Sequence, residues 1–177
     1  MHVVVEPLEK RVLLNGSVVA RLPDGSRLLE NGASLTRVYA DGSLDLAFGA
    51  GGTATIPIEG AELGPVAVQR DGKFLVGGDV NPNPASASLF VSGIELLLAR
   101  LNPDGSLDRS FGDAGMVVTD VAGHDDDACA TIVVQPDGKI LVGGWGYNGH
   151  GDPGMMWASS SALFAMAGSA SADVASR

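Results

Sequence analysis

The sequence predicts an all-β protein built from antiparallel four-stranded repeats. The first observation is compositional: 25 Gly and 9 Pro among 177 residues indicate many turns between short elements. The second is internal repetition, because two blocks of sequence recur in the same order. The third is the content of the blocks, in which Asp-Gly turns separate short apolar runs, as in β-hairpins.

The first block runs over 35–52 and recurs at 98–115. Both copies open with a Leu-x-Arg strand, turn at Asp-Gly-Ser-Leu-Asp and continue to Phe-Gly. Asp at such a turn bonds its own backbone, and Gly accepts the positive φ that the turn needs. Each copy therefore predicts a strand that ends in a self-capped turn.

The second block runs over 66–78 and recurs at 132–144 with the pattern Gln-x-Asp-Gly-Lys-x-Leu-Val-Gly-Gly. A fainter copy lies at 18–29. These copies divide the chain into five expected units, two of them full repeats. The units are an N-terminal segment (1–16), a degenerate partial repeat (17–34), repeat 1 (35–97), repeat 2 (98–154) and an Ala/Ser-rich tail (155–177).

One period contains four expected strands, near 53–57, 65–69, 73–77 and 95–101. Four antiparallel strands in roughly 60 residues are the size of one β-propeller blade. The chain would supply two blades and a degenerate start, which makes it a partial propeller. An incomplete propeller exposes blade edges, so self-association through those edges is one expectation.

The paired blocks resemble the bacterial delta-60 repeat, a β-propeller-like repeat of large secreted or cell-surface proteins, over roughly residues 35–146. Near the N-terminus, residues 8–14 resemble the LEPR-XLL motif of exported proteins, with Lys10 where that motif has Pro. The two resemblances imply an extracellular or cell-surface location and the front end of a longer exoprotein. The family has no assigned catalytic residues, so none is transferred.

Aromatic and lysine side chains recur at fixed places in the blocks. Phe48 and Phe111 each precede a Gly in a polar loop, and we expect them to plug that loop onto the blade core. Lys73 and Lys139 follow the Asp-Gly turns directly. A charge at the start of a strand is an ordinary solubilising choice, so both lysines are expected to be exposed.

Charged pairs recur as well. Arg37 and Arg100 stand inside apolar strands and are expected to pair with Asp45 and Asp108 or to cap carbonyls. A calcium site is a further reading, because Asp41/Asp45 and Asp104/Asp108 place oxygens where a calcium loop begins. Glycine stands at position 12 of that loop in place of the closing glutamate, so self-capped turns are favoured.

The segment 124–127, His-Asp-Asp-Asp, could be combined with Cys129 and His150 into a metal site, but the spacing matches no zinc or iron motif. A solvated loop is the favoured reading. Three histidines, no Gly-x-Ser-x-Gly elbow and no phosphate loop leave nucleophilic catalysis unsupported. We predict no catalytic, cofactor-binding or metal residue, no cofactor and no enzyme activity.

The formal net charge of −10 repels phosphate backbones and anionic headgroups, so nucleic acid is not an expected partner. The longest mostly apolar stretch, 155–168, is shorter than the roughly 20 residues of a membrane span. No apolar run follows the first charges, so an ordinary signal peptide is not visible. The single cysteine, Cys129, excludes an internal disulfide.

The favoured function is a non-enzymatic extracellular or cell-surface repeat module for binding or spacing, with an unknown protein or polysaccharide as ligand. One alternative is a carbohydrate-active or hydrolytic propeller whose carboxylates come from residues 125–127. Another is a gene fragment without independent function. The repeat stops before the tail, whose Ala/Ser-rich composition predicts disorder, and a shifted reading frame or truncated gene would explain this loss.

Overall fold

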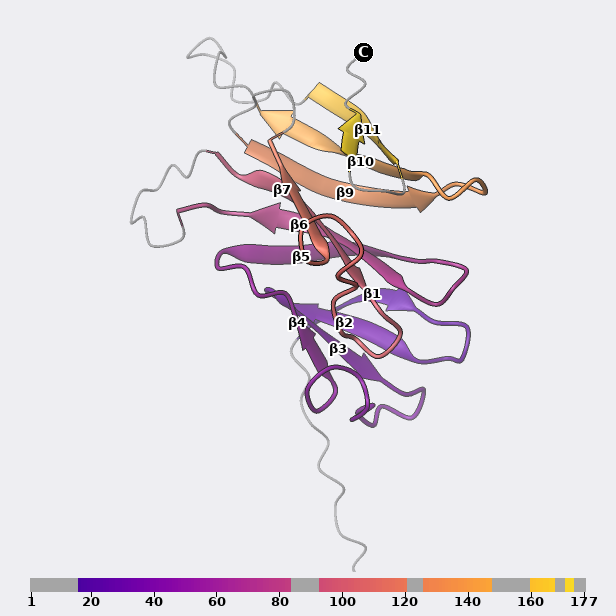
Figure 1. The fold of residues 1–177 in the computed structure, drawn as a ribbon. Coiled ribbons are helices and arrows are strands. Elements are labelled where there is room, and N and C mark those ends of the chain that lie inside the picture. The colour runs from indigo at the N-terminus through magenta and orange to yellow at the C-terminus, as the bar shows by residue number, and fades with distance from the viewer. Residues whose placement is uncertain (1–15, 84–92, 121–125, 148–159, 168–170, 174–177) are drawn as a thin grey trace, which may run out of the picture.

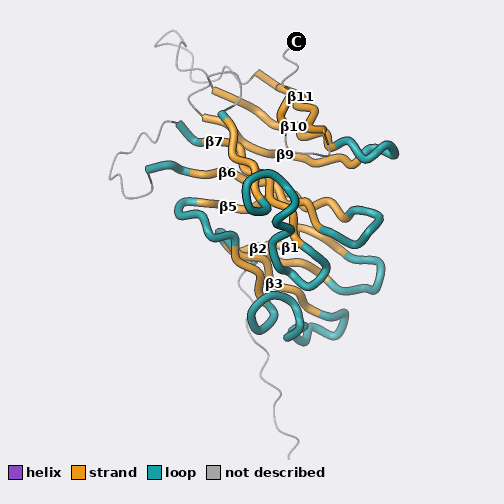
Figure 2. The backbone as a smooth tube through the Cα atoms, viewed as in Figure 1, coloured by secondary structure: helices purple, strands orange, loops and turns teal. Residues whose placement is uncertain are grey.

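The computed structural model describes residues 16–83, 93–120, 126–147, 160–167 and 171–173. This part of the chain consists of strands and loops (Figure 2). It contains no helix of the length and apolar character that crossing a membrane requires. The strands are β1 (Ser17–Arg21), β2 (Arg27–Asn31), β3 (Ser34–Val38), β4 (Thr53–Thr55), β5 (Ala61–Val68), β6 (Phe74–Val80), β7 (Glu95–Leu101), β8 (Met116–Thr119), β9 (Asp126–Val134), β10 (Ile140–Tyr147), β11 (Ser160–Ala167) and β12 (Ser171–Asp173).

The strands form three four-stranded antiparallel sheets in chain order: β1–β4, β5–β8 and β9–β12. The sheets stack one upon another, from indigo through magenta to orange and yellow (Figure 1). The first strand of the second sheet, β5, packs against both β1 and β9. This arrangement of consecutive meanders confirms the predicted all-β, four-stranded fold.

The sheets and the sequence repeats are out of phase. The expected repeats begin at residues 35 and 98, which lie in β3 and β7, the third strands of the first two sheets. The segment 17–34, expected to be a degenerate start, forms β1 and β2 and completes the first sheet. A sheet therefore joins the second half of one sequence period to the first half of the period that follows it.

Strand bounds follow the turns closely. Strand β7 covers the predicted range 95–101. Strand β5 starts at Ala61, earlier than the predicted residue 65, because a bulge between Leu63 and Val66 lets the pairing with β6 continue on both sides of Pro65. Strand β6 continues to Val80 because its glycines still pair with β7. Backbone pairing does not need a side chain, so glycine does not end the strand here.

The tail, expected to be disordered, contributes β11 and β12 to the third sheet. Strand β11 pairs with β10 over its length, and β12 pairs with β11. The edge of β10 that faces away from β9 has backbone N–H and C=O groups that need partners. The backbone of β11 supplies these hydrogen bonds, and its Ala and Ser side chains are not needed for the pairing. Backbone pairing, which needs no particular side chain, therefore gives residues 160–167 and 171–173 their places in the sheet.

Two apolar cores lie between the sheets. The first joins the sheets β1–β4 and β5–β8 around Leu28, Leu35, Phe74 and Leu97. The second joins β5–β8 to β9–β12 around Leu75, Leu96, Leu98, Ile140 and Val142. Successive residues of β6 and β7 thus serve opposite cores, as the period of two in a strand requires.

Phe48 and Phe111 are buried as predicted, with 1% and 2% of their surface exposed. We expected each ring to pack onto the core of its own blade, and the cores that the two rings enter are shared between successive sheets. Phe48 follows the first sheet's third strand, yet its ring meets Phe74 of the second sheet edge-on at 6.0 Å between centroids. Phe111 belongs to the second core, toward the third sheet. Each loop is therefore fastened to the next sheet as well as to its own.

Candidate functional site

The Asp-Gly-Ser turns are closed by their own side chains. In the first, the Ser43 amide and hydroxyl donate to Asp41 Oδ1 at 2.9 and 2.7 Å. In the second, Ser106 makes the same two bonds to Asp104 at the same distances. These bonds hold the pKa of both carboxyls below its usual range. The favoured reading of self-capped turns is confirmed.

The recurring arginines pair with the recurring aspartates, as predicted. Arg100 Nε donates to Asp108 Oδ2 at 2.7 Å, and its guanidinium lies 4.6 Å from the centre of the Phe111 ring. Arg37 lies 3.5 Å from Asp45 and donates to Asp24 at 2.7 Å. These charges are engaged within their own sheets.

The prediction for Lys73 is wrong. Its Nζ donates to Asp108 Oδ2 at 2.8 Å, and only 28% of the side chain is exposed. The bonds from Lys73 and Ser110, together with Arg100, lower the pKa of Asp108. Lys139 is exposed as predicted, and it pairs only with Asp137 of its own turn, at 3.0 Å. Asp108 lies 35 residues after Lys73, so local sequence spacing could not predict that the two side chains are in contact.

A pocket of about 420 Å³ opens at the end of the second sheet where β5 begins and β6 ends. Glu62 and Asp79 line it, and they are directly opposed residues of β5 and β6. Cross-strand partners lie on one face of a sheet, so two carboxylates meet here. Like charges in this arrangement destabilise the strand pair, which makes the pair a candidate functional site.

Asp79 also has a structural task. Its Oδ1 accepts a hydrogen bond from the Cys129 amide of β9 at 3.1 Å, which ties the second sheet to the third. The second sheet is tied to the first nearby, because the Leu63 amide of β5 donates to the backbone carbonyl of Gly32, between β2 and β3, at 2.9 Å. Burial raises the pKa of Asp79, the Cys129 amide opposes that shift, and the Glu62 charge adds to it.

Sequence analysis missed this pair. Asp79 follows the Gly-Gly of the second block, at the position that Trp145 holds in the other copy. Glu62 matches Ala128, and Ala128 and Trp145 are paired in the third sheet as Glu62 and Asp79 are in the second. The available signal was a pair of acidic residues at positions where the copies differ.

Of the residues considered for a metal site, only some fall in the described structure. His124, Asp125 and His150 lie outside the described residues. Asp127 is buried near the start of β9, and its amide donates to the Ile94 carbonyl at 2.8 Å. Burial, with the Asp79 charge, raises the pKa of Cys129 to about 12. Within the described ranges, no group of three His, Cys, Asp or Glu side chains could hold a metal ion.

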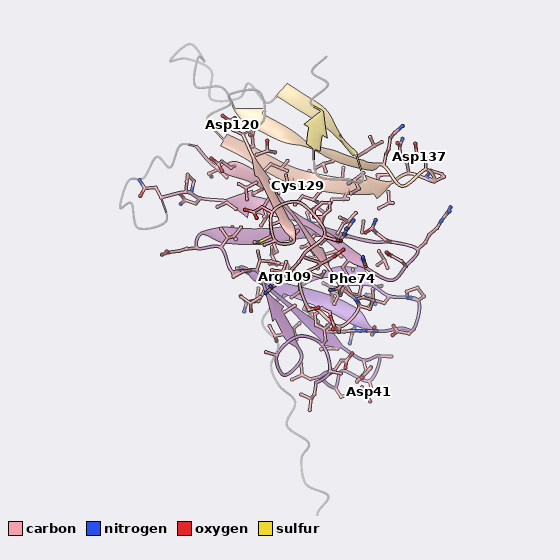
Figure 3. All side chains as sticks on the ribbon, viewed as in Figure 1. Asp41, Phe74, Arg109, Asp120, Cys129 and Asp137 are labelled. Atoms are coloured by element: carbon pink, nitrogen blue, oxygen red, sulfur yellow. The ribbon has the colours of Figure 1, made fainter. Side chains whose placement is uncertain are left out.

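A second pocket, of about 310 Å³, lies between the β5–β6 and β9–β10 turns. Gln69 and Gln135, the equivalent glutamines of the two blocks, both line it. The Oε1 atom of Gln69 is buried and has no hydrogen-bond partner. Both turns protrude on the same side of the stack, where Figure 3 labels Asp137.

Comparison with known proteins gives one match. The family described as "Domain of unknown function (DUF5122) beta-propeller" matches residues 69–111 and 135–156. This is a β-propeller-like repeat protein. Both matched segments of the repeat protein begin at the glutamine of the Gln-x-Asp-Gly-Lys turn. Searches of curated proteins and of solved structures found no match.

Proposed function

We propose that this β-propeller-like repeat protein is a non-enzymatic module of the delta-60 type, placed outside the cell or at the cell surface. It binds a protein or polysaccharide ligand or spaces neighbouring domains. One observation carries the proposal: the charged residues that recur with the repeat bind one another, whereas Glu62 and Asp79, which face a pocket, stand where the copies differ.

The engaged charges support a structural role for the repeat. Asp108 accepts bonds from Lys73, Arg100 and Ser110, so its oxygens have little capacity left for a ligand. The repeat therefore builds a scaffold, and residues that vary over the scaffold carry specificity.

The pocket at Glu62 and Asp79 favours a ligand that brings hydrogen-bond donors. Two carboxylates accept bonds from sugar hydroxyls or from cationic groups of a protein, and either ligand relieves the repulsion between them. The net charge of −10 favours the same ligands through long-range attraction of cations.

Calorimetric titration tests the proposal, using a panel of neutral and cationic polysaccharides and basic proteins. We expect a ligand whose affinity falls at least about tenfold in Asp79→Asn and Glu62→Gln. Glu95→Gln is the matched control, because Glu95 pairs with Val80 and not with a carboxylate. Equal binding by all three variants would place the ligand elsewhere.

The location is tested separately. Expression of the full coding region in the native host, followed by cell fractionation and protease treatment of intact cells, should find the protein in the medium or digest it at the surface. Protection from protease in intact cells would overturn the extracellular part of the proposal.

A hydrolytic propeller is the second candidate, and the raised pKa of Asp79 beside Glu62 favours it. A carboxyl whose pKa is raised is better suited to act as a general acid, with its neighbour as base or nucleophile. Release of reducing ends from a polysaccharide, abolished in both Asp79→Asn and Glu62→Gln, would replace the binding module with an enzyme. The sequence-based version of this candidate used residues 125–127, of which Asp127 is buried.

A fragment without independent function is the third reading. Stacked sheets that share two cores should unfold together, so a single sharp calorimetric transition is expected. Gradual melting without a heat-absorption peak would support the fragment.

A further inference from the structure

The two faces of a sheet in this stack differ in what they meet. We call the face toward the preceding sheet the back face and the face toward the following sheet the forward face. In the second sheet, the back face packs into the first core. Three of its cross-strand rows contain only apolar residues and one glycine: Val66–Val76–Ala99–Met116, Val68–Phe74–Leu101 and Gly78–Leu97–Val118. The fourth row, Ala61–Val80–Glu95, includes one glutamate.

The back face of the first sheet has the same pairing and a different chemistry. Strand pairing identifies its equivalent rows as Val18–Leu29–Thr36–Thr53, Arg21–Arg27–Val38 and Asn31–Ser34–Thr55. Each row contains polar residues where the second sheet has apolar ones. Thr36 replaces Ala99, Thr53 replaces Met116, and Arg27 replaces the buried Phe74.

The hydroxyls on this face satisfy one another. Thr36 and Thr53 are 3.0 Å apart at their oxygens, and Ser34 and Thr55 are also 3.0 Å apart. The residues between them, Leu35 and Ala54, point the other way and are buried in the first core. The polar pattern is therefore confined to one face of the sheet.

The opposite end of the stack differs. On the third sheet, Val133 and Leu141 are paired, at the positions that Ala67 and Leu75 hold in the second. Leu75 is fully buried against the third sheet, whereas Val133 is 51% exposed. The described part of the forward end thus exposes apolar surface at Val133, beside the exposed Thr131 of the same face, while the back end is mostly polar.

We infer that the sheet β1–β4 is a capping sheet, whose back face is a finished surface in contact with water. The stack is therefore open at this end, and a propeller ring does not close through it. In each hydroxyl pair only one O–H donates to the other oxygen. Packing this face against an apolar forward face would therefore leave the second O–H of each pair without water or a partner. Terminal repeats with a polar outer face have this role in other stacked-repeat proteins. The inference rests on the stacking of the sheets and does not depend on the proposed ligand.

A pair of matched substitutions tests the cap. Thr36→Lys and Ala99→Lys place the same charge at equivalent positions of the first and second sheets. We expect Thr36→Lys to change the melting temperature by less than about 2 °C, and Ala99→Lys to lower it by about 10 °C or to prevent folding. A loss of stability or a smaller oligomer in Thr36→Lys would show that this face is covered, which overturns the cap.

A second variant tests whether polarity keeps the face free. The triple change Ser34→Leu, Thr36→Ala and Thr53→Met copies the second sheet onto the first. The new apolar back face should then pack on the apolar forward face of another molecule, a head-to-tail contact that does not close. Light scattering after size exclusion should show a mass that rises with concentration. A variant mass equal to that of the unaltered protein would overturn the inference. Both experiments measure assembly, so they remain informative if no ligand is found.

Discussion

Lys73 Nζ lies 2.8 Å from Asp108 Oδ2, and this contact fastens the start of β6 to the turn that follows β7. The same carboxylate also accepts from Arg100, so one buried aspartate organises two strands of the second sheet. The third sheet has Lys139 at the position of Lys73, but this lysine pairs only within its own turn. The comparison leads to the first prediction.

Replacing Lys73 with Met should lower the free energy of unfolding by about 1 to 2 kcal/mol, because a charged hydrogen bond to a buried carboxylate is lost. Lys139→Met should change it by less than about 0.5 kcal/mol, since an exposed ion pair contributes little. Urea denaturation of the two variants measures the difference. Equal effects would contradict the assignment of Lys73 to the sheet interior.

The depressed pKa of Asp108 predicts how stability depends on pH. An unfolded Asp has a pKa near 3.9, and the folded value is lower, so the stabilisation is complete above about pH 5 and is lost as the pH falls. Asp108→Asn removes this contribution at every pH. The free energies of unfolding of the two proteins should therefore differ most at pH 7, and the difference should shrink steadily as the pH falls below about 4. A constant difference would contradict the shift.

Gly77 and Cys129 predict a steric coupling between the second and third sheets. A side chain at Gly77 would collide with the Cys129 Sγ, which lies between the sheets (Figure 3). Gly77→Ala should therefore destabilise the protein by about 1 to 3 kcal/mol. Adding Cys129→Ala should recover part of that loss, as a double-mutant cycle in urea would show. Independent, additive effects would mean that the two residues are not in contact.

The pKa of Cys129, raised to about 12 by burial and by the Asp79 charge, predicts an inert thiol. At pH 8 the native protein should react with a disulfide reagent at least about 100-fold more slowly than the unfolded chain. It is the only cysteine, so the signal has a single source. Asp79→Asn should react faster than the unaltered protein while remaining folded. Rapid labelling of the native protein would contradict the raised pKa and the partly buried position of the thiol.

Much of the local structure could be predicted from the sequence. The Asp41 and Asp104 turns, the bounds of β7 and the pairing of Arg100 with Asp108 all involve residues a few positions apart, where turn chemistry decides the geometry. Contacts between distant residues could not be predicted in this way. Glu62 and Asp79 became a candidate site only when the bulge in β5 set the strand register, and no local pattern specifies that register.

The sequence by itself determined that this protein is a repeating, antiparallel all-β chain, because Asp-Gly turns and alternating apolar residues act within one hairpin. Only the tertiary structure decided which sheet each face meets. Alternation separates the two faces of a strand but does not say which face points forward. It was the stacking that sent Phe48 to the next sheet, gave Lys73 its carboxylate and recruited the Ala/Ser-rich tail through backbone pairing. The same stacking left a face of Ser and Thr side chains at one end of the molecule.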